Sequence, residues 1–321
     1  MSGRLRAAVV GVGHLGRFHA EKYAAHPGVE LAAVVDTDEE RARAVGTALG
    51  VPALTDCRSL AGRVDCASVA VPTPSHYPVA CDLLSSGIDV LIEKPLTTSV
   101  GDGKALVELA VRGGRVLQVG HLERFNPAIR ALGGRVVEPR FIECQRLAQF
   151  GERGTDVDVI LDLMIHDLDL ILTMVTSPIR AVEAVGVPVL TPSVDIANAR
   201  LRFANGCIAN VTASRVSLRR ERKLRIFQPD AYFSIDFDER RGRVVRREPD
   251  DTGQPSLTFE NLEVREGDAL EEEIDAFVQA VRARQPPPVT GWDGLRALEV
   301  ADVIRESVEM EVRAAQAARV G

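Results

Sequence analysis

Short apolar runs alternate with segments of helical periodicity along the first third of the chain. Each apolar run is followed by a stretch in which apolar positions recur every three or four residues. Short apolar strands separated by helices pair in parallel through right-handed crossovers. The pattern therefore predicts an α/β, doubly wound parallel sheet, with strands at 5–10, 31–35, 66–71, 90–92 and 116–119 and helices from about 14 and at 39–49, 77–85 and 100–112.

The pattern changes after about residue 121. A helix is expected at 162–175, and six strand-like runs then follow with no helix between them. Strands without crossover helices indicate an α+β domain built on a large, mostly antiparallel sheet. Asn205-Gly206, between two of the runs, predicts a hairpin, because both residues tolerate the positive φ of a type I′ turn. The expected strands lie at 181–187, 197–203, 207–214, 224–227, 232–237 and 244–247.

The C-terminal part returns to helical periodicity. Helices are expected at 269–284 and 294–318, separated by the prolines at 286–288, and the segment 248–256 is the most loop-like. A length of 321 residues is typical of about two domains. We therefore expect one domain at 1–122, a second at 123–268, and C-terminal helices at 269–321 that pack back against the N-terminal domain.

Composition limits the partners and the compartment. The formal net charge of −7 argues against a nucleic-acid or anionic-membrane partner. No stretch approaches the ~20 apolar residues of a membrane span, and the N-terminus shows no signal-peptide pattern. The cysteine count is odd and none are close-spaced, which predicts reduced thiols in a cytoplasmic protein and no metal cluster. The five are Cys57, Cys66, Cys81, Cys144 and Cys207.

A glycine-rich turn, residues 11–16, follows the first predicted strand and opens the first helix. Its first glycine makes the tight turn, the second lets a pyrophosphate approach the backbone, and the third lets helix and strand pack closely. The free amides of the helix N-terminus then face the phosphates. Asp36 ends the second strand twenty positions after Gly16, where a carboxylate binds ribose hydroxyls and repels a 2′-phosphate. We therefore expect residues 1–122 to be a Rossmann domain that binds NAD, rather than a structural glycine turn beside an exposed aspartate.

Two further turns follow predicted strands of the same sheet. Val71-Pro72-Thr73-Pro74-Ser75-His76 follows one strand, and Glu93-Lys94-Pro95 follows the next. Ligands of doubly wound sheets bind at the carboxyl ends of strands, so these turns should line one crevice with the glycine turn. His76 either contacts the cofactor or lines the helix after it, and the sequence favours neither. The predicted cofactor-binding residues are Gly11, Val12, Gly13, His14, Leu15, Gly16, Asp36, Pro72, Thr73, His76, Glu93 and Lys94.

Lys94 is an unusual cation in this chain, because only four of the 39 cationic residues are lysines. Arginine does not release its proton in a protein, whereas a partly desolvated lysine can. A lysine at the end of a buried strand therefore suggests a need for a compact ammonium group. The competing interpretation is a lysine whose stem simply lies along apolar surface.

Asp162 and His166 form the second chemical cluster. Four residues apart on a helix, they share one face. A carboxylate beside an imidazole orients it and favours its charged form, which suits proton transfer near neutral pH. The flanking residues are apolar, so polar groups here are either paired structurally or functional. Spacing alone slightly favours a buried structural Asp–His pair over a functional one.

The motifs Gly-x-Gly-x-x-Gly, Glu93-Lys94-Pro95 and Asp162-x-x-x-His166, in this order, resemble those of the glucose–fructose oxidoreductase / inositol dehydrogenase / MocA family. The resemblance spans essentially the whole chain. It implies that Lys94, Asp162 and His166 are catalytic, with His166 as the leading general acid/base, Asp162 orienting it, and Lys94 hydrogen-bonded to the reacting hydroxyl. It further implies that the second domain binds substrate and forms a homodimer or homotetramer through its sheet.

The segments 121–127 and 154–162 resemble a bacterial branch of this family that acts on UDP-N-acetylglucosamine. That resemblance implies oxidation of the C3 hydroxyl to a ketone on a route to a diamino-sugar lipid A. Arginines at 215–222 suit a diphosphate, although charges along a sheet edge more often oppose aggregation. The alternatives are an inositol or simple aldose or polyol dehydrogenase and, in another class, an NAD-bound regulatory sensor. The predicted substrate residues are Arg124, Asn126 and Arg215.

Overall fold

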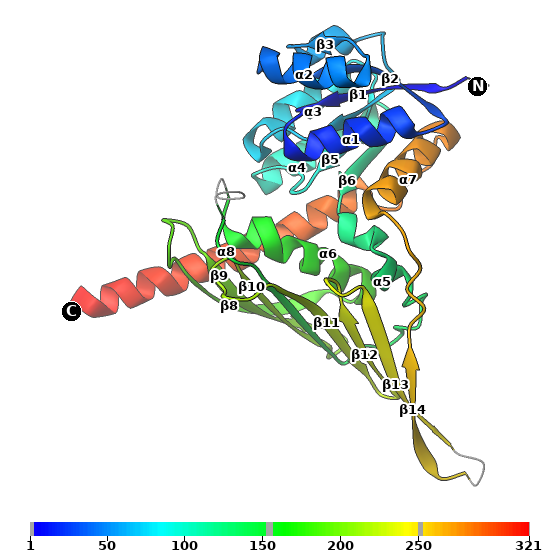
Figure 1. The fold of residues 1–321 in the computed structure, drawn as a ribbon. Coiled ribbons are helices and arrows are strands. Elements are labelled where there is room, and N and C mark those ends of the chain that lie inside the picture. The colour runs from blue at the N-terminus through cyan, green and yellow to red at the C-terminus, as the bar shows by residue number, and fades with distance from the viewer. Residues whose placement is uncertain (1–2, 152–156, 250–252, 321) are drawn as a thin grey trace. The chain divides into compact units, whose positions relative to one another are not determined.

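The computed structural model describes residues 3–151, 157–249 and 253–320 (Figure 1). Its contacts divide the chain into two compact units. Unit 1 comprises Met1–Leu122 and Asp268–Leu298, and unit 2 comprises Glu123–Gly267 and Glu299–Gly321. Helix α8 (Gly291–Val320) therefore contributes its first turns to unit 1 and the rest to unit 2. The boundary after Leu122 coincides with that of the predicted N-terminal domain, and the C-terminal helices predicted at 269–321 are divided between the two units.

Unit 1 is built on a six-stranded parallel sheet of order β3-β2-β1-β4-β5-β6. The chain runs outward on one side of β1 and then crosses to the other side, which confirms the doubly wound sheet. The strands are β1 (Leu5–Val10), β2 (Val29–Val35), β3 (Ala53–Leu54), β4 (Cys66–Val69), β5 (Asp89–Glu93) and β6 (Leu117–Gly120), and the helices are α1 (His14–Ala25), α2 (Glu39–Leu49), α3 (His76–Ser85), α4 (Val100–Arg112) and α7 (Ala269–Ala283).

Local sequence signals set the ends of the unit 1 helices. The Asp38 carboxylate caps α2 by accepting from the amide of Arg41, and Gly50, at φ 69°, ends it in the left-handed region that glycine adopts without strain. Asp268 caps α7 in the same way. Helix α7 belongs to unit 1 because its apolar face, which includes Ile274 and Phe277, packs into the core that covers β1 and β5.

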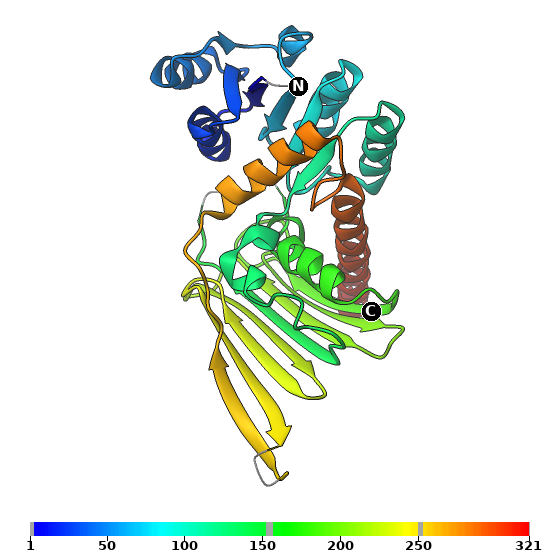
Figure 2. The same cartoon turned by 90° about the vertical axis from the view of Figure 1, so that its right-hand side faces the viewer.

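Unit 2 contains an eight-stranded sheet of order β14-β13-β12-β11-β7-β10-β9-β8 (Figure 2). Every neighbouring pair is antiparallel except β7 and β10, so the expected mostly antiparallel sheet is confirmed. Helix α6 packs against β10, and α5 against β12. The elements are α5 (Pro127–Arg130), β7 (Phe141–Leu147), α6 (Ile165–Met174), β8 (Ile179–Val187), β9 (Ile196–Phe203), β10 (Ile208–Ser214), β11 (Glu221–Gln228), β12 (Ala231–Asp236), β13 (Arg241–Pro249) and β14 (Pro255–Asn261).

Three sequence-based expectations for unit 2 need correction. The described sheet has eight strands rather than six, because β7 and β14 were not predicted. The segment expected to be a loop at 248–256 contributes to β13 and β14 on both sides. The hairpin at Asn205-Gly206 does join β9 to β10, but among its residues only Gly206 has a positive φ, of 85°. The turn is therefore not type I′, and the single left-handed glycine is typical of a longer hairpin loop with a bulge.

No helix in the described part of the chain is long and apolar enough to cross a bilayer.

Replacing Phe277 by alanine should destabilise unit 1. Phe277 is fully buried in the core shared by α7 and the parallel sheet, so the change should lower the free energy of unfolding by about 3–5 kcal/mol. Urea unfolding followed by the fluorescence of Trp292, the single tryptophan, measures this effect within unit 1. Val111→Ala is the control, because Val111 is 63% exposed and its truncation should change stability by less than about 0.5 kcal/mol. Equal effects from both variants would contradict the assigned core.

Candidate active site

The glycine turn has the backbone that a dinucleotide requires. Gly11 has a φ of 84°, and a Cβ there would lie 2.7 Å from the amide nitrogen of Val71. A Cβ on Gly16 would lie 1.7 Å from the carbonyl oxygen of Gly11. A Cβ on Gly13 would meet nothing within 4 Å. Two glycines are thus fixed by tight packing, and the middle one leaves open space beside the backbone, as the approach of a pyrophosphate requires.

Helix α1 begins directly after this turn. Its N-cap, Gly13, provides no side-chain hydrogen bond, and the first turn holds no acidic residue. Val12 is buried, whereas His14 and Leu15 are exposed on the first turn. A helix start without a side-chain cap leaves backbone amides available to an anion. The geometry therefore fits the pyrophosphate of a dinucleotide.

Asp36 ties the end of β2 to the glycine turn. One carboxylate oxygen accepts from the amide of Val12 at 2.9 Å, and the other accepts from the amide of Asp38 at 3.0 Å. The Arg41 guanidinium contacts both oxygens at 3.2 Å. These contacts hold the carboxylate at the end of β2, where it could accept hydrogen bonds from the ribose of a dinucleotide. The neighbouring Arg41 was not anticipated from the sequence.

The carboxyl ends of three neighbouring strands meet at one edge of the sheet. Val10 of β1 pairs with Val69 of β4, which pairs with Ile92 of β5. The glycine turn, the turn at 71–76 and Glu93-Lys94 therefore lie side by side in unit 1. Lys94 is partly buried, and its amide donates to the Glu93 carboxylate at 3.3 Å.

His76 lies inside this edge and is 1% exposed. Its Nδ1 lies 2.8 Å from the carbonyl oxygen of Pro95, and its Nε2 lies 2.9 Å from that of Val71. Burial lowers the pKa of His76, although these carbonyls oppose the shift. Of the two roles left open by the sequence, the geometry favours the structural one, in which His76 joins the turns after β4 and β5. Pro72 is exposed and Thr73 is buried at the start of the same turn.

In unit 2, Asp162 and His166 lie at a change in helix type. Residues Ile160–Met164 form a π-helical turn, and α6 continues from Ile165. Both candidate side chains are partly buried. π-helical turns inserted at helix starts are rare and occur often at functional sites. The sequence predicted the helix but not this wider turn. The turn changes how Asp162 and His166, four residues apart, are placed around the helix axis.

The start of α6 is anchored by a buried charge network under these residues. The Arg146 guanidinium, on β7, donates to the carboxylate of Asp167 at 2.8 and 3.0 Å and to that of Glu123 at 2.7 Å. Burial alone would raise the pKa of Glu123, but Arg146 outweighs it and the pKa lies below its ordinary value. Asp167 directly follows His166, so this network fixes the backbone that carries the imidazole. None of its three members was predicted as a site residue.

The three predicted substrate residues all make contacts within unit 2. The Nε of Arg124 donates to Asp169 at 2.7 Å, and Asn126 caps α5 through the amide of Ala128. Arg215 is 4% exposed, and its guanidinium donates to Asp195, to Thr191 and to the carbonyl oxygen of Val157. Because the Arg215 guanidinium already donates to three groups of this chain, few of its N–H donors could bind a diphosphate. Residues 154–156 of the resembling segment lie outside the described residues.

Arg222 on β11 has a different environment. It lies directly across from Arg146 on the neighbouring strand, and its nearest carboxylate oxygen, on Glu123, is 3.9 Å away. Burial lowers the pKa of Arg222, and the nearby Arg146 and Arg220 lower it further. Like charges that face each other across strands are unfavourable unless an anion lies between them. Arg222 is therefore a better anion-binding candidate than Arg215.

The chain matches two models of one protein family. The model described as "Oxidoreductase family, NAD-binding Rossmann fold" matches residues 5–121. The "GFO/IDH/MocA C-terminal domain" model matches residues 129–233. Together with the parallel sheet and glycine turn, these matches show that the chain belongs to the glucose–fructose oxidoreductase / inositol dehydrogenase / MocA family of NAD-binding oxidoreductases.

Individual relatives are sugar and sugar-nucleotide dehydrogenases. UDP-N-acetylglucosamine 3-dehydrogenase of Acidithiobacillus ferrooxidans is 40% identical over 95% of this chain and 97% of that protein. A solved structure of that enzyme has a TM-score of 0.90 at 39% identity, covering 96% of this chain and 98% of that one. Myo-inositol 2-dehydrogenase of Thermotoga maritima is 26% identical over 95% of this chain and 96% of that protein. Levoglucosan dehydrogenase in complex with NADH shares the fold, with a TM-score of 0.86 at 18% identity over 96% of this chain and 98% of that one.

Replacing Arg146 by leucine should destabilise unit 2, because it leaves Asp167 and Glu123 buried without their cation. The expected loss is about 3–5 kcal/mol, measured as faster hydrogen exchange of the β7 amides. Since the pKa of Glu123 lies below its ordinary value, its pairing adds stability above about pH 4.3 that is lost as the pH falls. Without Arg146, burial should instead raise the pKa of Glu123, as it already raises that of Asp167, so the variant should lose stability as the pH rises. Arg225→Leu is the control, because Arg225 and its partner Glu143 are about one-third exposed and their pair should contribute less than about 1 kcal/mol. Similar losses in both variants would contradict the network's role.

Proposed function

We propose that this protein oxidises the C3 hydroxyl of UDP-N-acetylglucosamine to a ketone with NAD as the hydride acceptor. The substrate assignment depends on the 40% identity, over 95% of the chain, to an enzyme named for this reaction. The fit of the glycine turn to a pyrophosphate and the position of Asp36 support the cofactor. We further propose that the reaction takes place in the cytoplasm, where NAD and sugar nucleotides are held.

Gly13 and the first amides of α1 would hold the pyrophosphate, and Asp36 would accept hydrogen bonds from the adenosine ribose. A carboxylate at this position repels the 2′-phosphate of NADP, which is the reason to propose NAD. The Arg41 guanidinium, 3.2 Å from both oxygens of Asp36, offsets part of the carboxylate charge and so weakens that repulsion. Bound NAD supplies the electrophilic ring carbon that takes the hydride.

The proposed catalytic group is Lys94, Asp162 and His166. His166 takes the proton of the reacting hydroxyl as its carbon gives up a hydride, and Asp162 orients the imidazole. Lys94 stabilises the negative charge that develops on the oxygen. The anchoring of α6 through Asp167 supports a fixed imidazole.

Arg222 is the proposed contact to the substrate diphosphate. It lies on the same face of the sheet as Arg146, because the two residues are directly opposed on neighbouring strands. The Glu123 carboxylate lies between the two guanidinium groups, 2.7 Å from Arg146 and 3.9 Å from Arg222, and a diphosphate would offset the repulsion that remains. Arginine suits a diphosphate because its planar donors can form two parallel hydrogen bonds.

We also propose a homodimer or homotetramer formed through the unit 2 sheet. Phe141, Phe227 and Tyr232 form a continuous aromatic group, with ring centroids 5.6 and 4.7 Å apart. They occupy the face opposite to that of the buried Ile142 and Ile226. A contiguous apolar group on a sheet face is typical of an interaction surface.

The second candidate function is an inositol dehydrogenase, favoured by the likeness to myo-inositol 2-dehydrogenase over 95% of the chain. The two candidates differ in the need for a nucleotide. UDP should compete with a UDP-sugar substrate and should leave oxidation of a free inositol unchanged. Reduction of NAD by myo-inositol, with none by UDP-N-acetylglucosamine, would favour the second candidate.

Lys94→Ala and His166→Ala should each lower kcat/KM for UDP-N-acetylglucosamine by at least about 100-fold, the scale of a positioned acid or base. NAD reduction followed by absorbance measures the change. Lys104→Ala is the control, because Lys104 is an exposed lysine on α4 and should have near-normal activity. Near-normal turnover of both active-site variants would remove the catalytic assignment.

Arg222→Gln should raise the KM for UDP-N-acetylglucosamine about 10- to 100-fold with a smaller change in kcat, because it removes a charge-assisted contact to a non-reacting group. Arg225→Gln provides the matched control. Arg225 lies on the same strand but on the other face, where it pairs with Glu143. An unchanged KM in Arg222→Gln would place the diphosphate elsewhere.

A further inference from the structure

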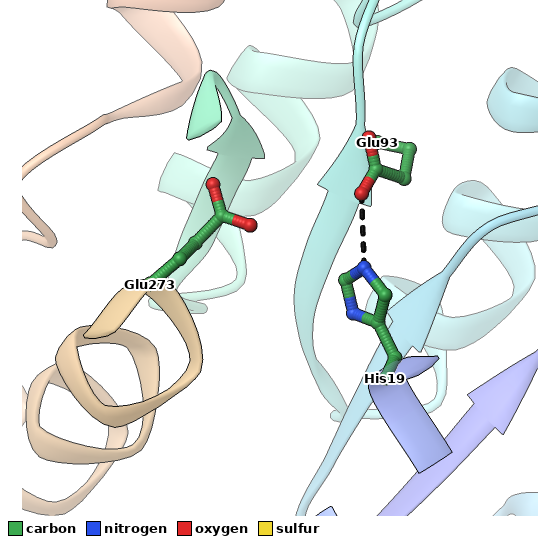
Figure 3. A group of neighbouring side chains, drawn as sticks. All are labelled: His19, Glu93 and Glu273. Atoms are coloured by element: carbon green, nitrogen blue, oxygen red, sulfur yellow. Dashed lines mark hydrogen bonds and ion pairs between the residues drawn. The ribbon is translucent and has the colours of Figure 1, made fainter. Parts of the chain in front are cut away.

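His19, Glu93 and Glu273 form a buried cluster within unit 1 (Figure 3). They come from α1, the end of β5 and α7. One nitrogen or oxygen atom from each lies within 4.8 Å of the others. His19 is 1% exposed and Glu273 is 0% exposed. Figure 3 shows the Glu273 carboxyl group directed toward the side where His19 and Glu93 meet.

Hydrogen bonds account fully for one of the two carboxyl groups. The Tyr23 hydroxyl lies 2.9 Å from the Ser68 Oγ, which lies 3.1 Å from the His19 Nδ1. The His19 Nε2 lies 2.9 Å from a carboxyl oxygen of Glu93. The pKa of Glu93 lies below its ordinary value, although burial opposes this, because His19 and Lys94 favour its ionised form. With Glu93 ionised and a neutral imidazole, one order of donors satisfies this chain: Tyr23 donates to Ser68, Ser68 to His19, and His19 to Glu93. Glu93 is then an ionised acceptor, and its second oxygen accepts from the amide of Lys94.

Glu273 is left out of this chain. Neither of its carboxyl oxygens has a hydrogen-bond partner among the described residues. A second buried carboxylate beside Glu93 would pay for desolvation and for repulsion between like charges with no compensating contact. Two carboxyl groups in one dry site remain stable when a cation lies between them, and that cation is either a proton or a metal ion.

We propose that Glu273 is a protonated carboxylic acid at neutral pH, so that Glu93 is the one ionised carboxyl group of this cluster. The hydrogen atom stays covalently bound to a Glu273 oxygen, so the pair carries one negative charge. Consistent with this, burial raises the pKa of Glu273 well above its ordinary value, and the charge of Glu93 raises it further. The titratable and charged groups around the pair are His19 and Tyr23 from α1, His76 from the start of α3, and Lys94 from the end of β5.

A proton is favoured over a metal ion by the contacts already present. His19 donates its Nε2 proton to Glu93 in the satisfied chain, so its nitrogen lone pair on that side is not available to a metal. A metal would require His19 to reverse its donor and would break the order of donors from Tyr23. One consequence reaches the end of β5, since the backbone that leads into Lys94 then lies beside one carboxylate charge rather than two.

The test compares the wild-type protein with Glu273→Gln, which replaces the neutral acid by a neutral amide of the same shape. Urea unfolding, followed by the fluorescence of Trp292 in unit 1, gives the folding equilibrium constant of each at several pH values. Above the unfolded-state pKa of about 4.3, the unfolded wild-type chain releases the proton while the folded chain keeps it. The wild type should therefore lose about tenfold in its folding constant, relative to the variant, for each pH unit up to the raised folded-state pKa.

Glu271→Gln is the matched control on the same helix, because Glu271 is 67% exposed and pairs with Lys22 at the surface. Its folding constant relative to the wild type should be nearly independent of pH. A ratio between Glu273→Gln and the wild type that also stays constant with pH would overturn the proposal.

A second measurement needs no variant. With carbon-13 in the glutamate carboxyl groups, the NMR spectrum of the wild-type protein should contain one glutamate resonance that keeps its un-ionised position at pH 7. Absence of such a resonance would overturn the proposal. A metal titration gives a further test. If one equivalent of Zn²⁺ or Mn²⁺ raised the melting temperature of the metal-free wild type but not that of Glu273→Gln, the cation between the two carboxyl groups would be a metal ion, and the proposal would be overturned.

Discussion

The parallel pairing of β1, β4 and β5 is the constraint on which the cofactor site depends. Because Val10, Val69 and Ile92 are register partners, three turns that are far apart in sequence emerge together at one edge. Packing then restricts what these turns can contain: Gly11 and Gly16 have no room for a Cβ, while the space beside Gly13 is open. The chemistry proposed for Lys94 depends on its place at this edge.

In both units, buried charged side chains hold the backbone that carries a proposed catalytic residue. In unit 2, the buried Arg146 pairs with Asp167 next to His166, so an ion pair fixes the backbone that carries the proposed catalytic imidazole. In unit 1, the Glu93 that precedes Lys94 is held by a chain of donors from α1. In each case the residue proposed for chemistry is fixed by a charged neighbour that does not itself react.

The sequence allowed the parallel sheet, the glycine turn and most strands of unit 2 to be predicted, because these depend on local periodicity and turn residues. Strand β7 was missed because Arg146 occupies a position of its buried face and breaks the apolar alternation. Arg215 was predicted to bind substrate because it lies in an arginine-rich segment. Its actual partner, Asp195, is twenty residues away in the sequence, so local sequence did not reveal that the guanidinium is already paired. Glu273 gave no signal, since a buried acid on an amphipathic helix can be recognised only from what packs against it.

The central claim is that NAD takes a hydride from C3 of UDP-N-acetylglucosamine, and isotope transfer tests it most directly. The protein is incubated with NAD and substrate that carries deuterium at C3, and the nicotinamide product is analysed by mass spectrometry. Transfer of the C3 hydride should give reduced NAD that contains one deuterium, together with a 3-keto sugar nucleotide. Reduced NAD without deuterium, or no reduction while free inositol is oxidised, would contradict it.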